Sequence, residues 1–339
     1  MREVQLRRER WPLREPFRIS RGVKTAADVV VVEVIEQGVT GRGEGVPYAR
    51  YGESVEGVLA QLESAAGALR EGMTRTELQA FMKAGAARNA LDCALWDLEA
   101  QLAGQTVWQL AGLPEPAALV TAQTISLDTP EAMGAAATRH AHRPLLKLKL
   151  DAHLVAERVA SVRAAAPAAR LIVDANEGWT PEVLEEALPA LESLGIELLE
   201  QPLKADQDGP LDGIGHALPI AADESCHTRA DLEALSRRYD FVNVKLDKSG
   251  GLTEALAMVG EARRLGLGVF VGCMICTSLS IRPALLVAAQ AEYVDLDGPL
   301  WLTNDREGGV RLGQDGRLEP GDAALWGGLS PRLALQTPT

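Results

Sequence analysis

Ionisable residues follow directly on six short apolar runs in the second two-thirds of this 339-residue chain. The runs end in Lys147-Leu148-Lys149, Asp174-Ala175-Asn176, Glu200-Gln201-Pro202, Asp223-Glu224-Ser225, Lys245-Leu246-Asp247 and Asp295-Leu296-Asp297. Any one of these residues is commonly a solvated strand end or a turn former. Six such endings, with three carboxylates in succession between lysines, indicate a chemical site.

The three successive carboxylates are Asp174, Glu200 and Asp223. If they end neighbouring strands of one parallel sheet, they converge and supply the hard oxygen ligands that Mg²⁺ prefers. Zinc is not indicated, because the chain has no H-E-x-x-H motif and its five histidines lack zinc-ligand spacing. The sequence therefore predicts a Mg²⁺ site.

Lysines beside the carboxylates offer an acid and a base. Lys147 and Lys149 are two residues apart, so their side chains point to the same side of a strand. Ammonium groups that close disfavour each other's charged form, which predicts a lowered pKa and a lysine base near neutral pH. Lys245 ends the sixth run and would face Lys149 across a barrel. A lysine on each face of a bound carbon, with a cation beside its carboxylate, suits removal and return of an α-proton.

Asp295 and Asp297 form a second pair with the same spacing. Two buried carboxylates that close repel each other, so a cation is expected between them. That cation is either a protein side chain such as Arg282 or the free α-ammonium of a ligand.

The elements that must position these residues recur regularly from residue 119 onward. Apolar runs return at intervals of about 20–28 residues, with helical stretches between them, which is typical of parallel β-α-β units. The runs are LVTAQTISL, PLLKLKL, ARLIVDA, IELLEQ, PIAADE, FVNVKLD, GVFVGCM and YVDLDG. Eight strands with seven intervening helices predict a TIM-like barrel, whose active site lies at the carboxyl ends of the strands. An open doubly wound sheet is disfavoured, since no G-x-G-x-x-G follows the first strand.

Helix boundaries in this part carry the expected residues. Thr129-Pro130-Glu131 and Thr180-Pro181-Glu182 each combine an N-cap threonine, a proline at the first helical position and an acid in the first turn. Gly195 and Gly266 are placed to end helices.

The first 118 residues have a different pattern. Val29–Ile35 predicts a strand, the glycine-rich GVTGRGEG predicts a turn, and TELQAFMKAGAARNALDCALWDLEAQLAG predicts a helix that stops at Gly104. Strands followed by helices predict a small α+β domain.

Composition excludes several function classes. Hydrophobic residues make up 47% of the chain and the net charge is −13, so nucleic acid and anionic membrane surfaces are disfavoured partners. No stretch is long and apolar enough for a transmembrane helix, and no secretory signal is visible, so we expect a cytoplasmic protein. Four cysteines make no disulfide framework; the C-x-x-C of Cys273 and Cys276 leaves a redox or zinc role as the lesser alternative to buried thiols.

The segments KLKLD, VDANEGW, LEQPL, ADESCHT and NVKLDKSGGLTEA resemble the enolase superfamily, in its muconate-lactonizing subgroup. Enzymes of this superfamily use a lysine or histidine base with Mg²⁺ to stabilise an enediolate. Within the subgroup, PFRISRG, YARYGESVEGV, AGAARNALDCALWDLEAQLAG, GCMICTS and DLDGPLW resemble dipeptide epimerases of the L-Ala-D/L-Glu type. The resemblance covers nearly the whole chain.

The resemblance implies roles for individual residues. The implied Mg²⁺ ligands are Asp174, Glu200 and Asp223, and the implied acid/base pair is Lys149 and Lys245, with Lys147 tuning Lys149. The implied substrate-binding residues are Asp295, Asp297, Lys147, Thr124, Met274, Cys276 and Arg21, with Lys24 as the alternative to Arg21. Asn176, Glu224 and Asp247 are expected to support this site from behind.

We therefore predict an α/β fold, a modified (β/α)7β TIM barrel at residues 119–299. An N-terminal α+β capping domain at residues 1–118 is completed by the C-terminal tail, residues 300–339. The expected reaction is Mg²⁺-dependent epimerisation of L-Ala-D/L-Glu-type dipeptides at the α-carbon of the C-terminal residue. The partner is a small-molecule dipeptide, and a homo-oligomer is expected only because the family is often oligomeric.

Three alternatives remain. A cycloisomerase, or an o-succinylbenzoate synthase/N-acylamino acid racemase, would share the metal ligands and lysines, but an anionic or N-acylated substrate gains nothing from two aspartates on the eighth strand. A non-catalytic ligand-binding barrel has no need of lysines on opposing strands. A sugar-acid lyase would be expected to carry a histidine on a late strand, and this chain has none there.

Overall fold

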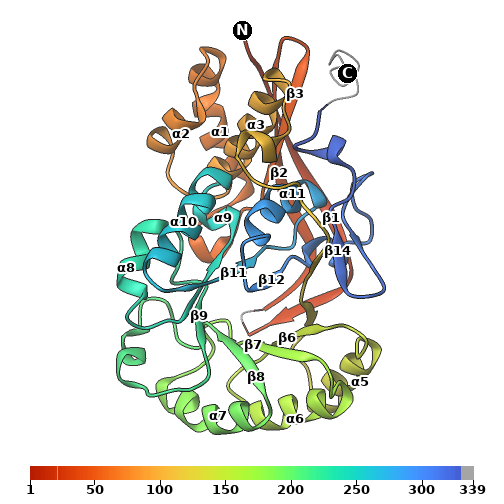
Figure 1. The fold of residues 1–339 in the computed structure, drawn as a ribbon, viewed down its shortest axis with the longest axis vertical. Coiled ribbons are helices and arrows are strands. Elements are labelled where there is room, and N and C mark those ends of the chain that lie inside the picture. The colour runs from red at the N-terminus through yellow and green to blue at the C-terminus, as the bar shows by residue number, and fades with distance from the viewer. Residues whose placement is uncertain (21, 330–339) are drawn as a thin grey trace.

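The computed structural model describes residues 1–20 and 22–329, which form a parallel barrel beside a domain of antiparallel strands and helices (Figure 1). Arg21, a predicted substrate ligand, and residues 330–339 of the predicted tail lie outside the described residues. The predicted fold class, a modified TIM barrel with an N-terminal capping domain, is confirmed.

Eight parallel strands form the barrel in sequence order. They are β5 (Gln123–Ile125), β6 (Leu145–Lys149), β7 (Arg170–Asp174), β8 (Ile196–Glu200), β9 (Ile220–Ala222), β10 (Phe241–Val244), β11 (Gly268–Gly272) and β12 (Tyr293–Asp295). The amide of Ala122 donates to the carbonyl of Val294 over 2.8 Å, which joins the first strand to the last. Each of the eight predicted apolar runs therefore contains a barrel strand.

Helices connect most of these strands. They are α5 (Pro130–Arg139), α6 (Val155–Ala165), α7 (Pro181–Ser193), α8 (Leu232–Leu235), α9 (Leu246–Ser249), α10 (Leu252–Arg264) and α11 (Ser278–Ala288). The expectation of seven intervening α-helical connections is wrong between β8 and β9, where the chain is described throughout and holds only a 3₁₀ turn, Gly209–Gly213. Glycine and proline in this connection disfavour a longer helix.

The predicted helix boundaries are confirmed. The side chains of Thr129 and Thr180 accept hydrogen bonds from the amides of Ala132 and Val183 and cap α5 and α7. Gly195 and Gly266 follow the ends of α7 and α10 with φ of 70° and 77°, a left-handed conformation that favours glycine.

The barrel interior is apolar at its floor and charged at its mouth. The floor is a small cluster of buried side chains, comprising Ala122, Leu145, Ile172, Leu198, Ala221 and Phe270. Side chains two residues apart on a strand point to the same face. The residues two positions beyond Leu145, Ile172 and Leu198 on their strands are therefore also directed inward, and these are Lys147, Asp174 and Glu200.

The N-terminal domain packs helices on an antiparallel sheet. Its strands are β1 (Glu3–Ile19), β2 (Gly22–Glu36) and β3 (Val39–Gly45), and its helices are α1 (Val55–Arg70), α2 (Arg75–Phe81), α3 (Ala86–Leu102) and α4 (Val107–Leu110). The β1–β2 hairpin is long, and its tip reaches toward the barrel (Figure 1). The helix predicted as one segment before Gly104 is broken at 82–85 into α2 and α3.

The glycine-rich segment 38–45 is largely a strand, so its assignment as a turn was wrong. The face of β3 that packs on α3 includes the glycines Gly41, Gly43 and Gly45. A Cβ atom on each would lie only 2.2, 2.0 and 2.2 Å from the carbonyl oxygens of Ala94, Ala90 and Ala86 respectively. The alternating glycines thus allow the helix backbone to lie directly on the strand.

The C-terminal segment contacts both parts of the molecule. The short strand β14 (Arg317–Glu319) pairs on one side with β13 (Arg311–Leu312) and on the other with β4 (Leu119–Val120). Residues 119–120 were predicted to belong to the first barrel strand. Arg306 binds Glu9 and Glu44 of β1 and β3 over 2.7 and 2.8 Å. The indole of Trp326 donates to the carbonyl of Cys93 on α3. The contacts of Arg306 and Trp326 join the tail to residues 1–118, whereas β14 joins it to residues 119–120. The division into residues 119–299 and residues 1–118 with the tail stays a prediction.

Candidate active site

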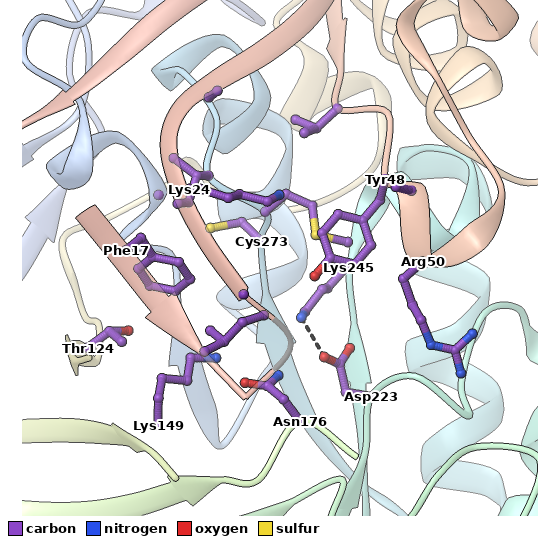
Figure 2. Close-up of a pocket in the computed structure, with 18 of the residues that line it drawn as sticks. Phe17, Lys24, Tyr48, Arg50, Thr124, Lys149, Asn176, Asp223, Lys245 and Cys273 are labelled. Carbon is purple, nitrogen blue, oxygen red and sulfur yellow. Dashed lines mark hydrogen bonds and ion pairs between the residues drawn. The ribbon is translucent and has the colours of Figure 1, made fainter. Parts of the chain in front are cut away.

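A cavity of about 690 Å³ lies between the carboxyl ends of the barrel strands and the capping domain (Figure 2). From the capping domain it is lined by the tip of the β1–β2 hairpin and by residues 46–51. The predicted site residues that line it are Thr124, Lys147, Lys149, Asn176, Asp223, Glu224, Lys245, Met274, Asp295 and Asp297. Four predicted site residues are buried and do not line it, namely Asp174, Glu200, Asp247 and Cys276.

The three predicted metal ligands end adjacent strands. Asp174 on β7 is in register with Glu200 on β8, and Glu200 with Ala221 on β9. Asp223 lies two residues beyond Ala221. All three carboxylates are at most 2% exposed.

Lysine ammonium groups bind these carboxylates. Lys149 Nζ lies 2.5 Å from Oδ2 of Asp174, and Lys245 Nζ lies 2.6 Å from Oδ2 of Asp223. Lys147 Nζ lies 2.6 Å from Oε2 of Glu200 and 3.1 Å from Oδ2 of Asp174. Lys149 and Lys245 enter the cavity from different strands (Figure 2).

Charge and burial oppose each other at this cluster. Burial lowers the pKa of Lys147, but its carboxylate neighbours raise that pKa well above its ordinary value; the same two effects act on Lys245, with the same result. Burial raises the pKa of Asp223, yet Lys245 and Lys248 hold it well below its usual range. Burial, with Asp174 nearby, raises the pKa of Glu200 to about 8. For Lys147 the carboxylates therefore outweigh the repulsion between lysines from which a lowered pKa was predicted.

The donor set fits Mg²⁺ chemically, since Asp174, Glu200 and Asp223 offer three hard oxygen ligands from adjacent strands. No three candidate ligand side chains within 1–20 and 22–329 are already spaced to share one ion. The oxygens that would face a cation are those that Lys147, Lys149 and Lys245 contact. A cation bound by these carboxylates would compete with the lysine ammonium groups for the same oxygens.

The two aspartates at the end of β12, Asp295 and Asp297, have different partners. Oδ2 of Asp295 lies 2.8 Å from Lys147 Nζ, whereas Oδ1 is buried and accepts no hydrogen bond from the described residues. Oδ2 of Asp297 accepts from the amide of Thr124 and the indole of Trp301. Burial, followed by the Asp295 charge, raises the pKa of Asp297 to about 6.

Arg282 does not neutralise this pair. Its guanidinium donates to the carbonyls of Pro320 and Trp326 instead. Within residues 1–20 and 22–329, the cation bound to this pair is Lys147, which contacts Asp295 and not Asp297.

The residues expected behind the site have separate partners. The amide of Asn176 donates to Oδ1 of Asp174 over 2.9 Å, and Glu224 is buried at the cavity wall. Oδ1 of Asp247 accepts from the amide of Val46 and from the side chain of Asn89, both in the capping domain. Asp247 therefore joins the barrel to the capping domain, which differs from the expected place behind the metal ligands.

The two cysteines of the C-x-x-C segment lie at and behind the cavity wall. Cys273 lines the cavity, Cys276 is fully buried, and both are free thiols. Burial raises the pKa of Cys276, which makes that thiol a poor nucleophile or metal ligand. The interpretation of Cys276 as a buried thiol agrees with this environment.

Three further residues behind the carboxylates were missed from the sequence. The side chain of Asn243 donates to Oε1 of Glu200 over 2.7 Å. Lys248 binds Asp223, and Gln201 binds the amide of Asp223. The spacing of Asn243, two residues before Lys245 on an inward-facing strand, could have indicated the first of them.

Family comparisons agree with this geometry. A model of the mandelate racemase / muconate lactonizing enzyme N-terminal domain matches residues 1–112, and an enolase C-terminal domain-like model matches 132–322. The L-Ala-D/L-Glu epimerase of Escherichia coli is 52% identical over 91% of this chain and 96% of its own length. An N-acetyl-D-glutamate racemase from a Pseudoalteromonas species is 42% identical, over 88% of this chain and 95% of its own.

Solved structures are similar over nearly the whole chain. An enolase family member from Agrobacterium tumefaciens with homology to dipeptide epimerases, which holds sodium and L-Ala-L-Glu, has a TM-score of 0.94 and 50% identity, covering 96% of this chain and 100% of that one. A dipeptide epimerase from Cytophaga hutchinsonii complexed with Mg and D-Ala-L-Val has a TM-score of 0.88 and 31% identity, covering 98% and 96%. With its barrel, its strand-end carboxylates and lysines and these relatives, the chain belongs to the enolase superfamily, in its mandelate racemase/muconate lactonizing group, and it is an isomerase.

Proposed function

We propose that this isomerase epimerises L-Ala-D/L-Glu-type dipeptides at the α-carbon of the C-terminal residue. Support comes from relatives named as dipeptide epimerases and from two lysines that enter one cavity from different strands. The proposed acid/base pair is Lys149 and Lys245. One lysine removes the α-proton and the other returns a proton to the opposite face, so the configuration inverts.

The proposed metal ligands and the Asp295/Asp297 pair would hold opposite ends of the dipeptide, its terminal carboxylate and its free amino group. Asp174, Glu200 and Asp223 would hold Mg²⁺, whose charge stabilises the negative charge that develops on the substrate carboxylate as the α-proton leaves. Asn176 and Asn243 hold Asp174 and Glu200 in place through hydrogen bonds.

The aspartate pair is the reason for proposing a dipeptide with a free amino terminus as the substrate. Asp295 and Asp297 both line the cavity, and Oδ1 of Asp295 is a buried acceptor to which no described residue donates. An α-ammonium group donates up to three hydrogen bonds and carries the charge that the pair attracts. N-acylated substrates carry no such charge.

A cation in the capping hairpin would bind the acidic side chain of the substrate. Arg21 lies outside the described residues, but Lys24 lines the cavity and its Nζ lies 4.5 Å from the centre of the Tyr48 ring. Its position on the cavity wall supports Lys24, the alternative to Arg21, as the residue that would pair with a glutamate carboxylate. The backbone at Met274, which also lines the cavity, would contact the substrate.

The N-acylamino acid racemase reaction is the second candidate, because one relative at 42% identity is named N-acetyl-D-glutamate racemase. Both reactions share the lysines and the carboxylates. The decisive test compares L-Ala-L-Glu with N-acetyl-L-glutamate and N-acetyl-L-Ala-L-Glu in D₂O with Mg²⁺, following deuterium at the α-carbon by mass.

We expect blocked substrates to lose about 100-fold or more in kcat/KM, because a charge-assisted pair in a desolvated site is worth about 2–5 kcal/mol and each 1.4 kcal/mol is tenfold. Asp297→Asn should reduce this difference in kcat/KM, because it lowers kcat/KM for the unblocked dipeptide alone. Blocked substrates that react as well as L-Ala-L-Glu would replace the epimerase with the racemase.

A further inference from the structure

The third proposed metal ligand, Asp223, lies beyond the end of its strand. The strand β9 ends at Ala222, so the Asp223 amide is not part of the β9 ladder. That amide donates to Oε1 of the Gln201 side chain over 2.8 Å. A side chain, rather than a neighbouring strand, therefore fixes the backbone of this ligand.

Gln201 uses its amide group completely. It is fully buried, and its Oε1 accepts from the amides of both Asp223 and Ser225, over 2.8 and 3.1 Å. Its Nε2, with two donor hydrogens, lies within hydrogen-bond distance of three acceptors, the carbonyl of Leu203 and the hydroxyls of Ser225 and Tyr239. A primary amide offers two donor hydrogens and two acceptor lone pairs, so any rotation of this side chain would break several hydrogen bonds.

Gln201 also adopts a backbone conformation that is uncommon for its residue type. Its φ of 36° lies in the left-handed region, and non-glycine residues held there persist when their surroundings fix them. Its own amide donates to Ala221, and its carbonyl accepts from Glu177. Gln201 therefore links the turns that follow three adjacent strands, β7, β8 and β9.

The carboxylate of Asp223 is fixed from the other side by a second buried residue. Lys248, 2% exposed, donates to Oδ1 of Asp223 over 2.6 Å, to the carbonyl of Asp223, and to the carbonyl of Asn243 over 3.0 Å. An ammonium group has three donors, and these three acceptors use them all. With Oδ1 held by Lys248, Oδ2 is the oxygen directed to Lys245 at the cavity.

We infer that Gln201, together with Lys248, is a positioning residue that presents Oδ2 of Asp223 to the metal ion and thereby sets the affinity for Mg²⁺. This inference rests on the proposed Mg²⁺ site. Gln201 does not line the cavity, and its side chain contacts the backbone amide of Asp223 and not its carboxylate, so it would act on this ligand through the backbone.

A matched pair of variants separates positioning from general support of the fold. Gln201→Met removes the oxygen that accepts the hydrogen bond from the Asp223 amide. Tyr239→Phe removes a hydroxyl from the same buried network, and that hydroxyl contacts Gln201 and Asp208 but not Asp223. Both lose hydrogen bonds, so both lower the Tm of the full-length protein.

Isothermal titration calorimetry of each purified full-length variant with Mg²⁺ alone measures its Kd for Mg²⁺. We expect Gln201→Met to raise the Kd for Mg²⁺ at least tenfold, which corresponds to about 1.4 kcal/mol, and Tyr239→Phe to leave it within about twofold. Turnover by Gln201→Met should be recovered when Mg²⁺ is raised to saturation. If Gln201→Met does not fold, Gln201→Asn, which is one methylene shorter, should show a weaker change in the same direction.

The outcomes distinguish the inference from the function on which it rests. If wild type binds Mg²⁺ and either glutamine variant binds it equally well, or if Tyr239→Phe weakens binding as much as Gln201→Met, the positioning role is overturned and the proposed function stands. If the wild-type protein binds no Mg²⁺ at all, both fall together.

Discussion

The two lysines of the proposed acid/base pair are buried in different surroundings. Lys149 binds Asp174 and its Nζ lies 5.9 Å from the centre of the Phe17 ring, which the capping hairpin contributes. Lys245 binds Asp223 and packs against Gly272, where a Cβ atom would lie 3.0 Å from its Cε. Each ammonium group therefore approaches the cavity from its own strand and with its own carboxylate.

Replacing either lysine should separate proton exchange from epimerisation. We expect Lys149→Ala and Lys245→Ala each to lose epimerisation of L-Ala-L-Glu by about 10²–10⁴-fold, the usual contribution of a positioned acid or base. Each variant should still exchange the α-proton of one stereoisomer, because the remaining lysine serves one face. Deuterium incorporation from D₂O into L-Ala-L-Glu and L-Ala-D-Glu, followed by mass, measures both.

The control for these variants is Lys83→Ala, since Lys83 is exposed and outside the cavity. It should keep wild-type activity. Near wild-type epimerisation by either cavity variant would contradict the two-base mechanism.

Asp297 should make substrate binding depend on pH. Burial, followed by the neighbouring Asp295 charge, raises its pKa to about 6. A carboxyl group loses its charge below its pKa, so attraction for the substrate ammonium weakens as the pH falls through about 6. We expect KM for L-Ala-L-Glu to rise below that pH, by up to about tenfold per unit, in assays between about pH 5 and 8.

Asp297→Asn is the control for this pH dependence. It should have a high KM that no longer changes over that range. A wild-type KM that stays level down to about pH 5 would show that Asp297 does not bind the ammonium group.

Sequence alone could predict the residues that end strands but not all the residues that hold them. Alternation along β6 and the run of strand-end carboxylates indicated Lys147, Lys149 and Asp174 because strand geometry is regular. Gln201 and Lys248 act through hydrogen bonds between separate turns, so their partners depend on the folded backbone and no spacing predicts them.

At the scale of elements, the contact between β3 and α3 decides how the capping domain packs. Glycine commonly marks a turn, which is why segment 38–45 was assigned as one. Its glycines at every second position also fit one face of a strand, and only the neighbouring helix shows which interpretation holds. The barrel strands were predictable because each is a short apolar run between helices with clear caps.

Gly43→Ala should destabilise the capping domain. The added Cβ would lie 2.0 Å from the carbonyl oxygen of Ala90, so α3 must move away from β3. We expect a loss of about 3 kcal/mol in the free energy of unfolding, at the upper end of the usual cost of overpacking, as measured by urea denaturation.

Gly67→Ala provides the matched control on α1. Nothing lies within 4 Å of the position its Cβ would take, and alanine is the better helix former. This variant should gain about 0.5–1 kcal/mol. Equal stability of the Gly43 and Gly67 variants would show that α3 does not need the glycine face.

At the scale of the whole molecule, buried polar contacts join the capping domain to the barrel and to the C-terminal segment. Asp247, just after β10, binds Val46 and Asn89, while Thr277, just before α11, donates its amide to Glu44 over 2.8 Å. The ends of two barrel strands are thus tied to the end of β3, where the capping domain begins to line the cavity. No helix in the described part of the chain is long and apolar enough to cross a membrane.

Trp326 tests whether the C-terminal segment completes the capping domain. It is 2% exposed, its indole donates to the carbonyl of Cys93 on α3, and the amide of the next residue, Gly327, donates to Asp97 of the same helix. Trp326→Ala should therefore cost about 3–5 kcal/mol in the free energy of unfolding. Hydrogen exchange followed by mass should accelerate first in α3 and β3, while β6 to β8 stay protected. Arg311→Ala, an exposed change on β13, should leave the free energy of unfolding and the exchange rates unchanged. If exchange in the Trp326 variant instead accelerates uniformly, the C-terminal segment belongs with the barrel.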